Sequence, residues 1–167
     1  MSMKDLDEAF RLLSQNAGTL HPRFVGPRPE SMIVAAEQAL GVRFPPTYRR
    51  FVSEFGCGSF TGTYVYGLGQ SLDQPVAANT VWKTKQERKH RLPAAFVVVG
   101  AVGEGTSLAL DLARRDPNEE SPTVTWGLVS AEDHASEVVA VTFGAYLLER
   151  VRVALRAAAD DLDPDDG

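Results

Sequence analysis

The sequence predicts a single α+β domain, mostly antiparallel sheet with helices packed mainly on one side. Three observations lead to this fold class. The first third of the chain carries apolar residues at helical spacings, and most of the second half consists of short apolar or alternating runs of strand length. A final amphipathic segment then closes the chain. Helices followed by hairpins and one more helix are typical of an antiparallel sheet backed by helices.

The chain opens with a predicted helix over residues 4–15, whose apolar side chains fall on one face. Gly18 is expected to end this helix. Residues 19–29 contain three prolines and one glycine, so they are expected to form an irregular connection to the next element.

Residues 30–56 predict two short helices joined by a tight corner. Gly41 supplies a left-handed stop for the first helix. Pro45 and Pro46 forbid its continuation and start the second helix. Apolar residues recur at spacings of three and four in both segments, so one face of each helix is expected in the core. These residues are Ile33, Ala36, Leu40, Tyr48, Phe51, Val52 and Phe55.

The rest of the chain predicts mostly strands. In order, we expect a strand over 63–68, a loop over 70–79, a helix over 80–91, a strand over 96–99, a turn over 100–105, strands over 107–112, 123–129 and 138–141, and a helix over 143–159. In the strand 107–112, Leu108, Leu110 and Leu112 are expected to face the core, with Ala109 and Asp111 facing outward. Gly105 is expected to supply a positive φ in the preceding hairpin turn.

Composition narrows the class of protein. The 167 residues suit one domain, and no apolar run approaches the roughly 20 residues that a membrane helix needs. The charged N-terminus does not resemble a secretion signal. Cys57 is the single cysteine, which excludes an internal disulfide and suits a reducing compartment. We therefore expect a cytoplasmic protein with no membrane partner.

The net charge of −5 is concentrated at one end. Residues 160–167 contain five aspartates and no base, while the rest of the chain carries 17 acidic and 17 basic side chains. The predicted organisation is therefore a folded domain over 1–159 and a flexible acidic tail over 160–167. Because the body lacks a basic excess, nucleic-acid binding is disfavoured. The tail could mimic nucleic acid toward a basic nuclease, and deleting it tests that hypothesis.

An ordered set of residues in the helical pair resembles the opening signature of the SUKH superfamily. The set is Glu30, Ile33, Ala36, Glu37, Leu40, Gly41, Pro45, Tyr48, Phe51, Phe55 and Gly56. A looser resemblance extends over residues 1–158, although Cys57 stands where the motif commonly has Asn and the turn AVGEGT lacks the usual Asp. The resemblance implies a SUKH-like fold. It also implies either a bacterial immunity protein that neutralises a toxin or a regulator of the fungal cell-wall type.

No pattern in the chain predicts a catalytic, metal or cofactor site. Cys57 lies between two glycines without a partnering base, and the histidines at 21, 90 and 134 lack metal-ligand spacing. Gly100, Gly103 and Gly105 lack the spacing of a phosphate-binding loop. Carboxylates that could include an acid/base pair are expected to be solvated; they are Glu104, Asp111, Glu119, Glu120, Glu132 and Asp133. We therefore expect no cofactor and no enzyme.

Two groups of residues are candidates for binding a protein partner. The segment 82–91 carries a local charge of +4, and on a helix Lys85, Arg88 and Lys89 would share one face. This face is either simply solvated, or it docks an acidic partner protein or contacts the Asp-rich tail of the same chain. Aromatic residues with a polar atom suit interfaces, which adds Tyr64, Tyr66 and Trp82. Alternation places Tyr64 and Tyr66 on the same face of their strand, either in the core or on an open face.

The sequence thus predicts a non-enzymatic protein-binding domain. Its leading interpretation is an immunity protein whose partner is a cognate toxin domain. One alternative is a regulatory adaptor of the cell-wall (glucan-synthesis) regulator type. The other is a small enzyme that uses Cys57 or a pair of carboxylates.

Overall fold

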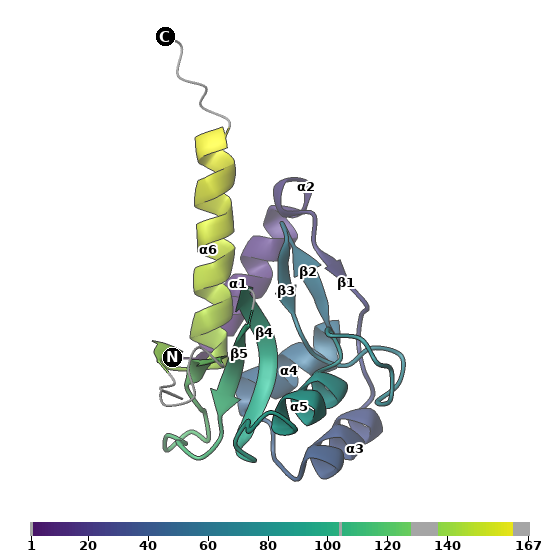
Figure 1. Ribbon diagram of the computed structural model, residues 1–167. Helices are drawn as coiled ribbons and strands as arrows, with labels where there is room; N and C mark the ends of the chain where they lie inside the picture. Colours follow the sequence, from purple (N-terminus) through teal and green to yellow (C-terminus); the bar gives the residue numbers. More distant parts are fainter. Residues whose placement is uncertain (1, 104, 128–136, 162–167) are drawn as a thin grey trace.

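The computed structural model describes residues 2–103, 105–127 and 137–161, and it confirms the α+β class (Figure 1). Its helices are α1 (Ser2–Gln15), α2 (Ala17–Leu20), α3 (Glu30–Leu40), α4 (Pro46–Phe55), α5 (Thr80–Arg88) and α6 (Phe143–Asp161). Its strands are β1 (Arg23–Phe24), β2 (Gly58–Phe60), β3 (Thr63–Val65), β4 (Phe96–Gly103), β5 (Thr106–Asp111), β6 (Thr123–Gly127) and β7 (Val138–Ala140). They form two antiparallel sheets, β1-β2-β3 and β4-β5-β6-β7.

The predicted pair of helices is confirmed as α3 and α4. Gly41 has φ 68° and ends α3 in the left-handed conformation, as expected. Arg49 of α4 then holds the two helices together, because its Nη1 donates to Glu30 at 2.9 Å and its Nη2 to Glu37 at 3.2 Å. Glu37 also accepts the Phe44 N–H at 2.8 Å. The carboxylates of the SUKH-like motif therefore fix the corner between its helices.

The N-terminal segment differs from the prediction. Gly18 does not end the first helix, since α1 stops at Gln15 and Gly18 lies inside the short α2. The expected connection over 19–29 contains β1, which pairs with β2. Gly58 permits this pairing, because a Cβ there would lie 2.1 Å from the Arg23 carbonyl oxygen. The requirement comes from a contact 35 positions away in sequence and is invisible in a local pattern.

The β4–β5 hairpin is longer than predicted. Gly100 and Gly103, assigned to a turn, are strand residues of β4, which pairs with β5 through two irregularities in register. Gly105 has φ 78°, as predicted for the hairpin turn. Glu104, between them, lies outside the described residues.

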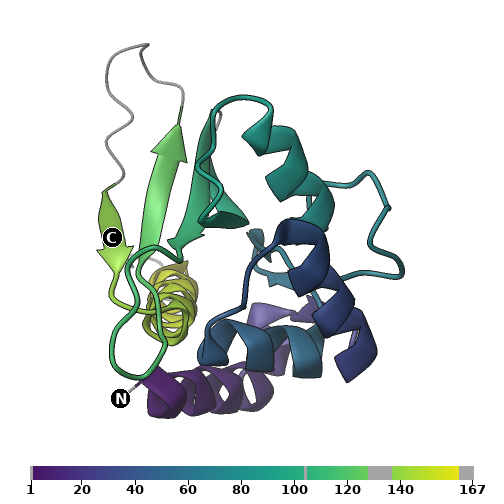
Figure 2. The same cartoon turned by 90° about the horizontal axis from the view of Figure 1, so that it is seen from below.

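Both faces of the four-stranded sheet are covered. Leu108 and Leu110 pack against the helices in the main core, as predicted. Ala109 and Asp111 were expected to face outward, but both are buried. Ala109 packs with Val98 and Trp126 in a second apolar cluster, and the Asp111 carboxylate accepts from Arg114. Figure 2 shows α6 end-on beneath one face of this sheet, with α1 beside it. The helices therefore do gather mainly on one side.

The chain changes sheets at Tyr66. The predicted strand 63–68 ends at Val65, and the Tyr66 N–H instead donates to the Val99 carbonyl of β4 at 2.9 Å. The buried hydroxyl of Tyr48 donates to the Tyr66 carbonyl at 2.8 Å, so the crossing is anchored to α4. After the loop, Asn79 caps α5 by accepting the Val81 N–H at 3.1 Å.

Helix α5 ends at Arg88 rather than at residue 91, and α6 extends to Asp161, two residues into the predicted acidic tail. Residues 162–167 lie outside the described part of the chain, as do residues 128–136. Long helix α6 packs along α1 (Figure 1). None of the helices in the described ranges combines the length and apolar character needed to span a bilayer.

Candidate functional site

The basic helix predicted as a partner surface is only partly available. Lys85 and Lys89 are exposed and Trp82 is half-buried, so these three could meet a partner. Arg88 instead makes intramolecular hydrogen bonds: its Nη2 donates to the Leu40 carbonyl at 3.0 Å and to the Ala94 carbonyl at 2.9 Å. Burial lowers the pKa of Arg88. Its guanidinium therefore joins the end of α3 to the segment before β4.

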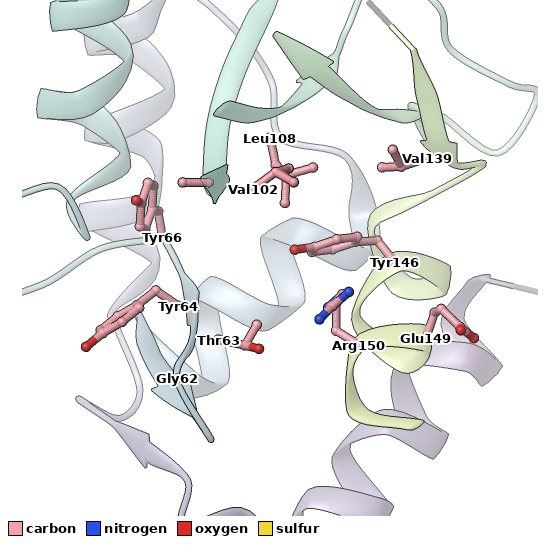
Figure 3. Close-up of a pocket in the computed structure, with 11 residues that line it drawn as sticks. Gly62, Thr63, Tyr64, Tyr66, Val102, Leu108, Val139, Tyr146, Glu149 and Arg150 are labelled. Atoms are coloured by element: carbon pink, nitrogen blue, oxygen red, sulfur yellow. The ribbon is translucent and has the colours of Figure 1, made fainter. Parts of the chain in front are cut away.

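The two tyrosines predicted to share a face occupy different environments. Tyr64 is 61% exposed, whereas Tyr66 is 8% exposed. The prediction of one common face is wrong because β3 ends between them and the chain turns toward β4. Both nevertheless line the same hollow, Tyr66 at its inner wall and Tyr64 at its rim (Figure 3).

This hollow, which we call the groove, has a volume of about 450 Å³. Three parts of the chain far apart in sequence form it: the β2–β3 hairpin with Tyr66 after it, strands β4 and β5, and the stretch from β7 into the first turns of α6 (Figure 3). Val102, Leu108 and Val139 supply apolar walls. Tyr146 and Arg150, one turn apart on α6, supply polar atoms. The groove therefore combines apolar side chains with the hydroxyl of Tyr146, the two tyrosines Tyr64 and Tyr66, and one cation.

The surroundings of Tyr146 and Glu149 determine the protonation of the first and the direction of the second. Tyr146 is buried apart from its access to the groove, and this burial raises the pKa of Tyr146 to about 12, although the nearby Arg150 opposes the shift. Its hydroxyl is therefore protonated at neutral pH. Glu149 also lines the groove, but its carboxylate accepts from Arg156 at 3.2 Å and points away from the cavity in Figure 3.

The candidate catalytic residues that the structure describes show no pairing of a nucleophile with a base. Cys57 is buried, and burial raises the pKa of its thiol, the opposite of what a nucleophilic cysteine needs. Within residues 2–103, 105–127 and 137–161, no group of three or more His, Cys, Asp or Glu side chains has the geometry of a metal site. His134, Glu104, Glu132 and Asp133 lie outside those ranges.

Two of the carboxylates expected to be solvated are buried with partners. Asp111 accepts from the Arg114 Nε at 2.7 Å and from the Ala113 N–H at 3.1 Å. Glu120 accepts from both the N–H and the hydroxyl of Thr47 at the start of α4, at 2.8 and 2.9 Å. Of the three predicted carboxylates that the structure describes, Glu119 is the one that is exposed as expected. The roles of Asp111 and Glu120 are structural, because Asp111 closes a turn and Glu120 caps α4.

The comparisons with known proteins agree with this architecture. A family model described as SMI1-KNR4 cell-wall, of the SUKH group, matches residues 30–147. The chain belongs to the SUKH superfamily. No curated protein matches it at a significant level. The matched range contains the α3–α4 pair, strands β2 to β7 and the first turn of α6, so the SUKH match covers most residues that line the groove.

The motif residues of this SUKH domain build the core rather than the groove. Ile33, Tyr48 and Phe51 are fully buried, and the rings of Tyr48 and Phe51 lie against Phe143 of α6. Their packing sets where α6 begins. The motif therefore positions the helix that carries the groove's polar side chains without contributing its own.

Sequence reasoning missed the groove residues Val102, Val139, Tyr146 and Arg150. One signal was present: Tyr146 and Arg150 are spaced one turn apart and fall beside the predicted apolar stripe of α6. Nothing local indicated that this flank faces β3, because the contact depends on how two sheets and a helix meet.

Proposed function

We propose that this SUKH domain is a non-enzymatic protein-binding domain, and specifically an immunity protein that neutralises a toxin by direct binding in the cytoplasm of the producing cell. The observation that carries the proposal is where exposed apolar side chains gather. Five of the nine large apolar residues that are exposed in the described part of the chain lie at the groove, in β7 or immediately after β7. They are Tyr64, Val102, Val138, Val139 and Val141. Such clustering is typical of interaction sites.

The strand β7 adds a second feature that suits a protein partner. It is the last strand of its sheet, and in Figure 2 it forms the outer edge, with no described segment beyond it. Unpaired N–H and C=O groups on an edge can accept a strand from another chain. Val139, 47% exposed, belongs to both this edge and the groove, so one partner could occupy both.

In the proposed mechanism the protein inhibits the toxin by covering part of its surface, without a chemical reaction. A toxin that inserts a side chain into the groove and extends over β7 would use both features in one interface, and stable interfaces bury about 1,600 Å² in total. Bound stoichiometrically, this SUKH protein would block or distort the toxin's active site. Tyr64 would be a central anchor, since exposed aromatic residues beside a pocket supply much of the binding energy in interfaces.

A regulatory adaptor is the second candidate function. The description of the matching family, SMI1-KNR4 cell-wall, favours it. The neighbouring genes distinguish the two: a toxin coding region beside this gene supports immunity, whereas its absence, with several endogenous partners recovered on purification, supports the adaptor.

The decisive experiment is protection in cells. The toxin domain encoded beside this gene is expressed in a sensitive host together with the wild-type protein, with Tyr64→Ala, with Val139→Lys, or with Val34→Lys as the control. Val34 is a comparably exposed apolar residue on α3, outside the groove. We expect the wild type and the control to protect and the two groove variants to fail. Failure of the wild type to protect would overturn the immunity proposal. Full protection by both groove variants, at equal protein levels, would overturn the assignment of the groove as the binding surface.

A further inference from the structure

We propose that the groove binds a carboxylate side chain of the protein partner, held by Arg150 and Tyr146 and flanked by apolar residues of the same partner segment. This inference rests on the proposed protein-binding function and adds the chemistry of what is bound. It predicts that an aspartate or glutamate between apolar neighbours is the part of the partner that enters the cavity.

The charge inside the groove is the first argument. Arg150 makes no hydrogen bond or ion pair with any residue that the structure describes, although it lines a cavity. The adjacent acid does not neutralise it, because Glu149 is bonded to Arg156 at 3.2 Å and points away (Figure 3). The groove therefore presents one uncompensated positive charge.

The polarity of the other groups is the second argument. Tyr146 keeps its proton at neutral pH, and in Figure 3 its hydroxyl points into the space between α6 and β4. Thr63, across the groove from Arg150, carries a further hydroxyl. A guanidinium and hydroxyls suit a ligand rich in acceptors, and a carboxylate accepts from all of them.

The apolar walls decide between a carboxylate and a phosphate. Val102, Leu108 and Val139 leave room for methyl and methylene groups beside the charged end. Partial exclusion of water by these walls also strengthens a charge-assisted hydrogen bond. A phosphate carries close to two negative charges and is bound by clusters of arginine, whereas Arg150 is the only cation among the groove-lining residues that the structure describes.

The test uses capped tripeptides and the full chain. Acetyl-Val-Asp-Val-amide and its Asn counterpart are titrated into the ¹⁵N-labelled protein, and the Arg150 Nε–H and Thr63 amide resonances are followed. We expect millimolar binding of the Asp peptide and about fivefold to tenfold weaker binding of the Asn peptide, because a charge-assisted hydrogen bond is roughly twice as strong as a neutral one. Inorganic phosphate is titrated separately.

Variants of α6 test whether Arg150 provides the preference for the Asp peptide. Arg150→Gln should remove the preference for Asp over Asn, and Arg150→Lys should retain most of it. Arg152→Gln removes an exposed cation of α6 that does not line the groove, so it should behave as the wild type. Equal binding of the two peptides, shifts confined to residues outside the groove, or tighter binding of phosphate than of the Asp peptide would each overturn the inference.

Failure of this inference can be told from failure of the proposed function. If Tyr64→Ala loses protection while Arg150→Gln keeps it, the domain binds its toxin but no carboxylate enters the groove. If the Asp peptide binds as expected while both groove variants still protect, the groove recognises carboxylates and the toxin binds elsewhere.

Discussion

Glu120 joins three parts of the fold, and removing its carboxylate should measurably destabilise the protein. The residue is 3% exposed and lies in the loop before β6, 73 positions from its partner in α4. Its two oxygens accept from the N–H and the hydroxyl of Thr47. The Thr47 hydroxyl oxygen in turn accepts the Gly144 N–H at 3.1 Å, at the start of α6. Because Pro45 provides no capping side chain, Glu120 acts as the cap of α4.

The magnitude follows from what Glu120→Ala leaves behind. The variant loses two hydrogen bonds to a carboxylate and leaves two buried donors of Thr47 without their acceptor. Such bonds contribute about 1.5–3 kcal/mol each, offset by the cost of burying the charge, so we expect the free energy of unfolding to fall by about 2–4 kcal/mol. Glu119→Ala is the matched control. Its side chain is exposed, so a change below about 0.5 kcal/mol is expected.

The same residue predicts a pH dependence with a definite sign. Burial raises the pKa of Glu120 above its ordinary value of 4.5, against the hydrogen bonds from Thr47. The native state therefore binds the proton more readily than the unfolded state does. The contribution of Glu120 to stability is fully present below the unfolded pKa and decreases as pH rises through the folded pKa.

Urea unfolding, followed by circular dichroism between pH 4.5 and 7.5, measures both effects. Glu120→Gln keeps one acceptor and has no titrating proton, so its stability relative to the wild type isolates the titration. We expect the wild type to gain stability over this variant as pH falls. Parallel stability curves would refute the raised pKa, and an alanine variant as stable as the wild type would refute the structural role.

Three further outcomes are expected. Asn79→Ala removes the cap of α5 and the donor to carbonyls within residues 71–74, and should lower the free energy of unfolding by about 2–3 kcal/mol in urea melts. Tyr48→Phe leaves the Tyr66 carbonyl without its donor and should cost about 1–2 kcal/mol, whereas an unchanged melt would contradict that bond. Cys57 should react with a disulfide reagent about 100-fold more slowly in the native than in the urea-unfolded protein at pH 8; equal rates would show an accessible thiolate.

The parts of the fold that could be predicted from sequence are those governed by local rules. Helices α3 and α4 follow from apolar spacing, and the stop at Gly41 follows from its freedom to adopt a positive φ. Helix α6 could be predicted from the apolar stripe along residues 143–159. The predictions fail where a contact with a residue far away in sequence determines the local structure. Gly58 is required by β1, and Glu120 is drawn out of solvent by the start of α4, although both look like ordinary loop residues in sequence.

In the candidate site, too, residue types could be predicted from local sequence, whereas the environments that depend on distant contacts could not. Tyr64 and Tyr66 could be proposed from their residue type, and both line the groove. Their different exposure could not be predicted, since alternation applies only while a strand continues and β3 ends at Val65. The only signal for Arg150 was its position beside the apolar stripe of α6, one turn from Tyr146, and a cation there is ordinary until a second element closes over it.

The fold and the proposed binding surface depend on different residues. Ile33 and Tyr48 are fully buried and set the packing of the helices, whereas Tyr64 and Val139 are exposed at the groove and support no core contact. Rim substitutions should therefore change binding while leaving the free energy of unfolding within about 0.5 kcal/mol. One bond connects the two sets, from the Tyr48 hydroxyl to the Tyr66 carbonyl at the groove's inner wall. Through that bond the buried motif fixes where the groove lies, while its rim stays free to vary.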